Sequence, residues 1–290
     1  SSTSGQAASK VQAASAAGSK LIIGPATNGE VSRIISGTSL PRPPILALVA
    51  NNSAGGTHIW PLYGDAIDSA LEGVGVAVAA KQKTIVVVHE ANFPAENLLR
   101  LREGISLKGG TTAGFVPYPA DGKNLSAAFA NGAAVFNKAD TIVLLGGGEA
   151  IGQVIDILAA GEFGKSIATA IATSLIQEEI YKRPSAQGLM VAIPSTSSVS
   201  VISDRFKARY GREPSYDAAM GYDSIAIAAG LVRSGGTDAI TIANLTSLQG
   251  FRAATGLFRF RPDGRIERRM VVHRIENGSL TIIQEEGAGF

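Results

Sequence analysis

The 290-residue sequence contains no cysteine, which excludes thiol catalysis, disulfide bonds and zinc–thiolate sites. It holds only three histidines, and it has no His-x-x-x-His pair, Gly-x-Ser-x-Gly motif or Asp-x-Asp run. A formal net charge of +2 gives no electrostatic reason to expect nucleic acid. No apolar run approaches the roughly 20 residues that span a bilayer. These absences argue against an enzyme, a metal site, a nucleic-acid partner and a membrane-spanning segment, and the sequence calls for no cofactor.

What is present describes a compact globular protein. Apolar residues make up 45% of the chain and charged residues 17%, and the length suits two cores better than one. Short, nearly continuous apolar runs alternate with longer amphipathic segments, which is typical of strands buried by helices on both faces of a parallel sheet. The expected strands are residues 20–25, 44–50, 84–90, 141–147 and 166–172. We therefore predict a doubly wound α/β fold, in which ligands bind outside the carboxyl ends of the strands.

The C-terminal stretch, residues 256–283, departs from this rhythm. Apolar and charged residues alternate there, with turn signals at Pro262-Asp263-Gly264 and Asn277-Gly278, which predicts a β-meander with one solvated face. Six arginines lie between Arg259 and Arg274, and we interpret them as a solvated strand face rather than an anion or partner site.

The glycines in "TIVLLGGGEAIG" (141–152) stand where a strand turns into a helix, as in phosphate-binding loops. The dinucleotide fingerprint fails because its third glycine would fall at Ile151. The P-loop pattern fails because no lysine follows Gly152. Glu149 also places a negative charge where an anion would lie. We interpret these glycines as permitting a tight strand-to-helix turn.

Three stretches carry a resemblance to a known family: residues 7–30, residues 83–129, and the C-terminal third. The C-terminal third is the most specific, with Tyr210-Gly211, Pro214-Ser215, Gly221-Tyr222-Asp223, Gly250-Phe251, Thr255-Gly256 and a Phe-x-x-Asp-Gly turn over residues 260–264. Together they resemble the type I periplasmic solute-binding family, in its branched-chain amino acid branch. The sequence from Phe258 to Arg269 resembles that of a subgroup of the family, the penicillin-binding protein activators.

The resemblance implies two α/β lobes joined by three crossing strands, with a ligand cleft between them and hinge closure on binding. The crossings are expected near Lys83, Pro194 and Gly256, so lobe one would combine residues 1–82 and 194–255, and lobe two residues 83–193 and 256–290. The family normally opens with a strand, a helix and a second strand that are absent before "AASKVQ". We expect that these residues are omitted or cleaved, or that another segment takes their place.

The resemblance also implies positions for the ligand site. The residues expected to donate hydrogen bonds to a carboxylate are Thr27 and Asn28 after the first strand, and Ala50, Asn51, Asn52 and Ser53 at the end of the second. The positions expected from lobe two are Glu90, Asn92, Phe93, Gly148 and Thr173.

The lobe-two positions lack the clamp that the resemblance implies for amino acid binders. The expected tyrosines fall at Phe93 or Pro94 and at Gly148, and the expected acidic residue falls around Ala172 to Ser174. An ammonium group buried without a counter-charge costs several kcal/mol. Glu90 could replace that acid, or could be an ordinary residue of the fold. Outside this set, Asp223 is expected to fix a buried helix start and Trp60 to pack between elements.

Two functions remain open. In the first, the chain is an exported, periplasmic receptor that binds a small amino acid-like or other carboxylate solute and hands it to a membrane permease. In the second, it is a penicillin-binding protein activator-like scaffold that contacts a cell-wall synthase without a small ligand. Both imply a targeting segment that this sequence does not contain, and both are compatible with a lipid anchor.

Overall fold

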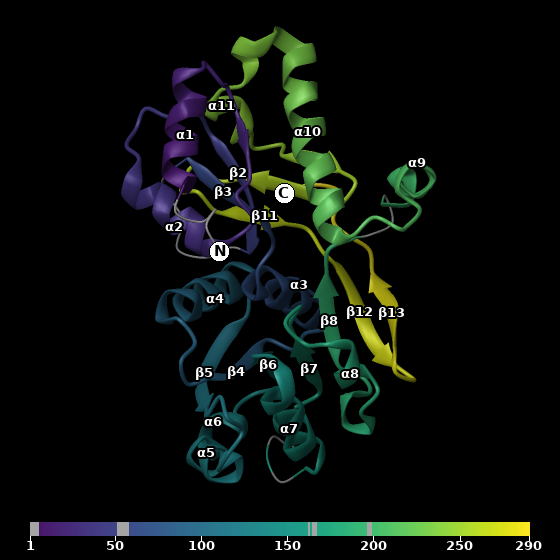
Figure 1. Ribbon diagram of the computed structural model, residues 1–290. Helices are drawn as coiled ribbons and strands as arrows, with labels where there is room; N and C mark the ends of the chain where they lie inside the picture. Colours follow the sequence, from purple (N-terminus) through teal and green to yellow (C-terminus); the bar gives the residue numbers. More distant parts are fainter. Residues whose placement is uncertain (1–5, 51–57, 162, 164–166, 196–198) are drawn as a thin grey trace. The chain divides into compact units, whose positions relative to one another are not determined.

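The computed structural model describes residues 6–50, 58–161, 163, 167–195 and 199–290, and it divides into two compact units (Figure 1). Unit 1 comprises Ser1–Asp65, Pro194–Arg269 and Gly287–Phe290, and unit 2 comprises Ala66–Ile193 and Met270–Glu286. Within the described ranges, no helix is both long and apolar enough to cross a membrane.

Unit 2 is built on a mainly parallel sheet. Its strands are β4 (Thr84–Glu90), β5 (Thr111–Tyr118), β6 (Thr141–Leu145), β7 (Thr169–Ala172), β8 (Met190–Ile193), β12 (Val271–Glu276) and β13 (Ser279–Gln284). Their order across the sheet is β13-β12-β8-β7-β6-β4-β5. The five strands from β8 to β5 run parallel, and β12 and β13 extend the sheet in antiparallel fashion. This is the doubly wound arrangement that the apolar runs predicted.

Helices cover both faces of the unit 2 sheet. They are α3 (Ala66–Ala79), α4 (Ala95–Leu107), α5 (Leu125–Asn131), α6 (Ala133–Phe136), α7 (Gly148–Ala159), α8 (Glu178–Tyr181) and the 3-10 helix η2 (Pro184–Ala186). Alternate residues of β4 point to opposite faces, so Val86 and Val88 join the core beneath α5 to α8, and Ile85 and Val87 join the core beneath α3 and α4. Burial on both faces explains why these strands read as unbroken apolar runs.

Unit 1 contains two three-stranded sheets. One consists of the parallel strands β1 (Ile22–Ile23), β2 (Ile45–Ala50) and β3 (Ile59–Tyr63). The other consists of the antiparallel strands β9 (Phe251–Ala253), β10 (Gly256–Phe260) and β11 (Ile266–Arg268). The helices of unit 1 are α1 (Ala7–Ala16), α2 (Asn28–Gly37), α9 (Ser200–Tyr210), α10 (Tyr216–Gly235), η4 (Thr237–Ala239) and α11 (Ile242–Leu245).

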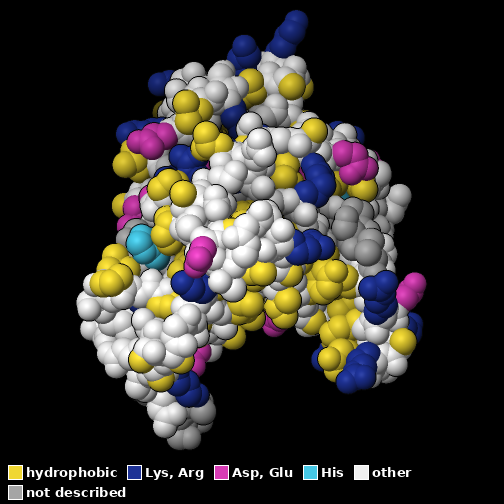
Figure 2. Space-filling view, turned by 90° about the horizontal axis from the view of Figure 1, so that it is seen from above, with side chains coloured by type: hydrophobic (Ala, Val, Ile, Leu, Met, Phe, Trp, Pro, Cys, Tyr) yellow, Lys and Arg dark blue, Asp and Glu magenta, His cyan; other side chains and the backbone are white. Residues whose placement is uncertain are grey.

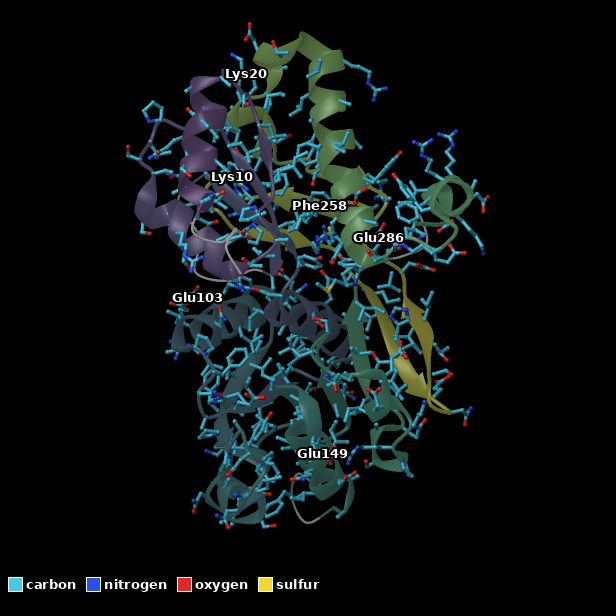
Figure 3. All side chains as sticks on the ribbon, in the orientation of Figure 1. Lys10, Lys20, Glu103, Glu149, Phe258 and Glu286 are labelled. Atoms are coloured by element: carbon cyan, nitrogen blue, oxygen red, sulfur yellow. The ribbon has the colours of Figure 1, made fainter. Side chains whose placement is uncertain are left out.

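Two apolar cores hold unit 1 together. Ile45 and other residues on one face of β2 pack against α1 and α2. On the opposite face, Leu46 and Trp60 pack with α10, α11 and Phe258 of β10, which is labelled in Figure 3. The indole Nε1 of Trp60 donates a hydrogen bond of 2.7 Å to the carbonyl of Arg261. Trp60 therefore joins the two sheets of unit 1, and it packs between elements as the sequence predicted.

The C-terminal strands are antiparallel, as the alternating sequence predicted, but they do not form one continuous meander. The turn at residues 262–264 joins β10 to β11 in unit 1, and Asn277-Gly278, both with positive φ, joins β12 to β13 in unit 2. The chain passes from one unit to the other between these two hairpins, at residues 269 and 270. An alternating pattern specifies the faces of each strand but not the sheet that receives it, so the division was not foreseen.

The chain passes between the two units at 65/66, 193/194 and 269/270, and the crossings expected from the sequence were near Lys83, Pro194 and Gly256. The helix α3 belongs to unit 2 because Ile67 and Val74 are buried against that unit's sheet. Residues 256–269 belong to unit 1 because Phe258 and Phe260 complete its core. A fourth passage at 286/287 returns the last four residues to unit 1, where the side chain of Arg269 donates to the carbonyl of Gly289 at 2.7 Å.

Candidate functional site

The carboxyl edge of the unit 2 sheet brings together three of the expected site positions. Strands β4, β6 and β7 are parallel neighbours, with His89 in register with Leu145 and Leu144 in register with Ala172. The residues that follow these strands therefore meet at one edge. They include Gly148 and Thr173, and Glu90 is itself the last residue of β4.

Glu90 ends β4 and is partly buried. One oxygen of its carboxylate accepts a hydrogen bond of 3.3 Å from the backbone N–H of Gly147, at the start of α7. Within the part of the chain that the structure describes, Glu90 forms no ion pair with a lysine or arginine. An acidic group thus occupies the positive end of the α7 dipole. This arrangement disfavours a phosphate there and favours a cationic group beside Glu90.

Tyr118 lies beneath this edge and was not among the residues expected from the sequence. It ends β5, is fully buried, and donates from its hydroxyl to the carbonyl of Leu145 at 3.2 Å. Burial, and then the nearby charge of Glu90, raise the pKa of Tyr118 above its ordinary value. The hydroxyl occupies the space that a side chain on Gly146 would need. The signal for it was the pairing of the two neighbouring strands, which places Tyr118 opposite Glu90.

A different structural constraint applies at each of the three glycines, residues 146–148. Gly146 has a φ of 158° and lies against the Tyr118 hydroxyl, whereas a Cβ on Gly147 would meet the carbonyl oxygen of Leu175 at 3.0 Å. Gly148 has a φ of 62°, in the left-handed region, but open space surrounds the position of its missing Cβ. The predicted tight strand-to-helix turn is confirmed, because β6 ends at Leu145 and α7 begins at Gly148.

The segment after β7 is held from within unit 2. The side chain of Thr173 is fully buried, and its hydroxyl accepts from the backbone N–H of Leu175 at 3.4 Å. The buried hydroxyl of Ser69, from α3, donates to the carbonyl of Ala192 at 2.6 Å and accepts from the N–H of Ser174 at 3.0 Å. Thr173 therefore shapes this loop, and its side chain presents no surface to solvent.

Asn92 and Phe93 lie in the turn between β4 and α4. The side chain of Asn92 is exposed, whereas Phe93 is half-buried and packs against the core under α3 and α4. The N–H of Phe93 donates to the carbonyl of Glu90 at 2.9 Å. Phe93 thus anchors the turn that follows Glu90, while the side chain of Asn92 is exposed to solvent.

In unit 1, the expected positions lie at the start of α2 and the end of β2. The hydroxyl of Thr27 caps α2, since it accepts from the N–H of Glu30 at 3.3 Å and donates to the Glu30 carboxylate at 2.8 Å. Asn28 is the first residue of α2 and is exposed. Ala50 ends β2 and is exposed, whereas Asn51, Asn52 and Ser53 lie outside the described residues.

Two further residues differ from what the sequence suggested. Asp223 does not fix a helix start, because α10 begins at Tyr216 and is capped by Ser215. Its buried carboxylate accepts from the N–H groups of Ala254 and Thr255, at 2.9 and 3.0 Å. Arg268, in the arginine-rich stretch, is only 2% exposed and donates to the carbonyl of Leu62 at 2.8 Å.

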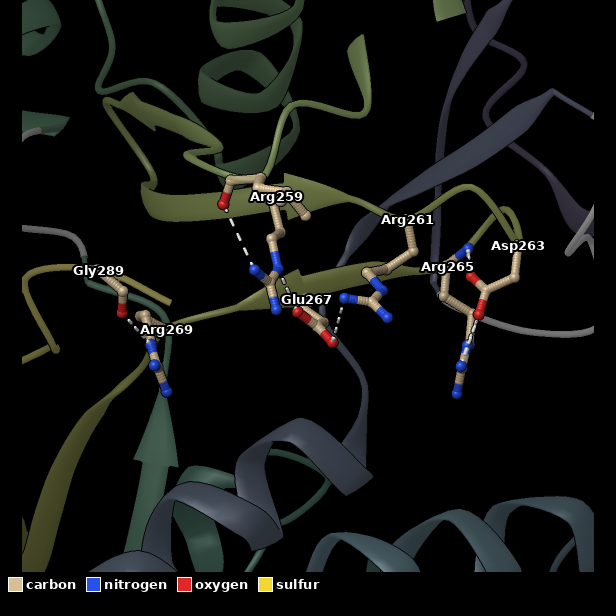
Figure 4. A network of polar contacts seen from close by, with 8 residues as sticks. Arg259, Arg261, Asp263, Arg265, Glu267, Arg269 and Gly289 are labelled. Carbon is tan, nitrogen blue, oxygen red and sulfur yellow. Dashed lines mark hydrogen bonds and ion pairs between the residues drawn. The ribbon is translucent and has the colours of Figure 1, made fainter. Parts of the chain in front are cut away.

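The other arginines of this stretch in unit 1 make local contacts (Figure 4). Arg259 and Arg261 both pair with Glu267, and Arg265 pairs with Asp263 at 2.6 Å. On the face drawn in Figure 2, lysine and arginine side chains are interspersed with apolar and neutral ones. In the described ranges, no group of three His, Cys, Asp or Glu residues is placed to hold a metal ion.

Comparison with solved structures shows the same fold. A leucine-binding protein from Thermotoga maritima superimposes with a TM-score of 0.63 and 17% identity, covering 97% of this chain and 84% of that one. A branched-chain amino acid transporter protein from Rhodopseudomonas palustris gives a TM-score of 0.70 and 15% identity, covering 97% and 81%. A solute-binding protein from R. palustris in complex with benzoate gives 0.60 and 13% identity, again covering 97% and 81%.

No curated protein matches the sequence. The family match nevertheless extends over almost the whole chain, because residues 2–279 fit the family described as periplasmic binding protein. The parallel sheet with its antiparallel extension and the solved neighbours agree with that match. The chain belongs to the periplasmic binding protein family and has its type I fold.

Proposed function

We propose that this chain is a non-catalytic periplasmic receptor that binds a small amino acid-like solute and delivers it to a membrane permease. The family match supports a solute-binding role, and so do the solved neighbours, which include a leucine-binding protein and a solute-binding protein in complex with benzoate. The position of Glu90 is the observation that favours an amino acid as the solute. The Glu90 carboxylate lies at the carboxyl edge of the unit 2 sheet, where such folds bind ligands, and could hold a solute ammonium.

Glu90 suits an ammonium group for an electrostatic reason. The N–H of Gly147 already holds the carboxylate in place, so a charge-assisted hydrogen bond to an ammonium group would not have to restrict the Glu90 side chain further. Asn92, exposed in the next turn, is a further polar group available at this edge. In unit 1, Asn28 remains a separate candidate donor to a solute carboxylate.

The test compares solutes with and without an ammonium group. Thermal unfolding of the wild type is measured with millimolar L-amino acids and with benzoate. A solute at 100 times its dissociation constant adds about 2.7 kcal/mol to the free energy of unfolding, which corresponds to an increase of roughly 5 to 10 °C in the melting temperature for a chain of this size. We expect one class of amino acids to stabilise the wild type.

Glu90→Gln removes the charge and keeps the shape, and it should abolish the stabilisation. Glu96→Gln is the matched control, because Glu96 lies exposed in the first turn of α4. Stabilisation by benzoate but by no amino acid would refute recognition of an ammonium. Equal stabilisation of Glu90→Gln and the wild type would exclude Glu90 from the site.

The second candidate is a scaffold that regulates a cell-wall synthase through protein contacts without a small ligand. Two features of unit 2 favour it. Gly148 supplies no aromatic side chain where the resemblance implies a clamp, and the buried, uncharged Thr173 occupies the loop where an acid is implied. A protein that no amino acid or aromatic acid stabilises, and that co-purifies with a cell-wall synthase, would support this function over the first.

A further inference from the structure

A groove lies within unit 1, between α10 and β9. Its volume is about 670 Å³, and all of its lining residues belong to unit 1. Small-molecule sites usually measure about 300–1,000 Å³, so the groove is large enough for an organic ligand. Helix α10 supplies one wall, and β9 with the flanking residues Gly250 and Ala254 supplies the other. The carboxyl edge of the unit 2 sheet contributes nothing to it.

Gly230 keeps this groove open. It stands inside the 20-residue helix α10, where glycine is less favourable than alanine. Neither a positive φ nor a close contact requires glycine there, since a Cβ on Gly230 would meet no heavy atom within 4 Å. Because Gly230 lines the groove, a side chain at this position would project into it and reduce its volume. Packing and backbone conformation do not require glycine at this position, and the missing side chain leaves the groove open.

The groove combines an apolar floor with a positive rim. Ile227, Leu231 and Phe251 contribute buried or half-buried apolar surface. Arg233, near the end of α10, and Arg252, on β9, line the groove with exposed, positively charged side chains, and Arg252 also donates to the carbonyl of Ala288 at 3.4 Å. The acidic lining residue among the described ones is Asp223, and its buried carboxylate already accepts hydrogen bonds from Ala254 and Thr255.

We propose that this groove binds an amphipathic organic anion, with an apolar body and a carboxylate. The body would lie along Ile227 and Leu231, and the carboxylate would pair with Arg233, since an arginine presents its N–H groups in the geometry that a carboxylate accepts. The site is separate from the solute site proposed in unit 2 and does not depend on it. The chain would then carry two ligand sites of different chemistry, one that accepts an ammonium group and one that accepts a carboxylate.

The experiment uses 4-benzoylbenzoate, an aromatic carboxylate that crosslinks to nearby residues under ultraviolet light. Affinity is measured by calorimetry, and crosslinked peptides are located by mass spectrometry. We expect saturable binding, with crosslinks in residues 222–233 or 250–254, and weaker binding of the neutral carboxamide. Crosslinks confined to other parts of the chain would overturn the proposal, and so would equal affinity for the carboxamide.

Two leucine variants on the same helix provide the matched comparison. Gly230→Leu fills the groove, whereas Gly221→Leu places the same side chain on α10 outside the groove lining, where a Cβ also meets nothing within 4 Å. We expect Gly230→Leu to weaken binding about tenfold or more, and Gly221→Leu to leave it unchanged. Equal affinity of the two variants would overturn the proposal. Arg233→Glu provides a second measurement should Gly230→Leu fail to fold, and unchanged binding in Arg233→Glu would refute the role of the charge.

Discussion

The buried carboxylate of Asp223 should dominate the stability of unit 1. It accepts hydrogen bonds from the N–H of Ala254 at 2.9 Å, from the N–H of Thr255 at 3.0 Å and from the hydroxyl of Thr255 at 2.6 Å. Asp223→Ala leaves two buried N–H groups without an acceptor, and each such loss costs about 1–3 kcal/mol. Arg268, which donates to the carbonyl of Thr255 at 3.0 Å, also loses a nearby negative charge. We expect unit 1 to lose about 4 kcal/mol in total.

The chain contains a single tryptophan, Trp60, which is fully buried in the core of unit 1. Its fluorescence during urea denaturation therefore follows unit 1. With a slope of about 2 kcal/mol per molar urea, Asp223→Ala should lower the fluorescence midpoint by about 2 M. Asp223→Asn keeps one acceptor oxygen and should cause about half that shift.

Asp238→Asn is the control, because Asp238 is highly exposed and its ion pair with Lys20 should contribute less than about 1 kcal/mol. If the midpoint of Asp223→Ala fell within about 0.3 M of this control, the hydrogen bonds would not stabilise unit 1 as the structure implies.

Two further predictions concern unit 2. Gly146→Ala should destabilise it by about 2 kcal/mol, because the new methyl group collides with the Tyr118 hydroxyl. Adding Tyr118→Phe removes that hydroxyl and should recover part of the loss. A double-mutant cycle, with unfolding followed by circular dichroism, should therefore show coupling between the two positions, and no coupling would contradict this packing. Burial lowers the pKa of His273 in the folded state below its ordinary value of 6.5. The neutral side chain therefore contributes its full stabilisation above pH 6.5, and this stabilisation is lost as the pH falls from 6.5 through the folded-state pKa. His273→Gln should therefore reduce the slope of stability against pH below 6.5, and an unchanged slope would exclude His273 as its source.

The parallel sheets could be predicted from the sequence because burial on both faces leaves a direct pattern. The runs at 44–50 and 84–90 correspond to β2 and β4 almost residue for residue. The runs at 20–25 and 167–172 predicted longer strands than β1 and β7, because apolar composition does not reveal where ladder hydrogen bonds stop, and residue 166 of the second run lies outside the described residues. The unit boundaries depend on which sheet buries α3 and β10, and periodicity carries no information about that choice.

The candidate site could be predicted only as far as its strand ends. Glu90 and Gly148 were expected at the site from the family resemblance, and in the structure they lie at the end of β4 and just after β6, at the carboxyl edge of the sheet. Tyr118 was missed because it lies on a different strand from Gly146 and Glu90, and only the folded sheet brings its hydroxyl close to them. The buried state of Thr173 could not be foreseen either, since the bonds that set its loop come from Ser69, more than one hundred positions earlier.

The hydrogen bond between Trp60 and Arg261 joins residues 201 positions apart, and it has a consequence for the newly made chain. At about 5–20 residues per second, a ribosome needs roughly 10–40 s to supply the second partner after the first. Throughout that interval, Leu46 and Trp60 lack the phenylalanines of β10 that bury them in the finished protein. The parallel strands of unit 2 are contiguous in sequence and can associate meanwhile. A chain still being synthesised should therefore recruit chaperones through unit 1, and it should release them only once the hairpin of β10 and β11 has emerged.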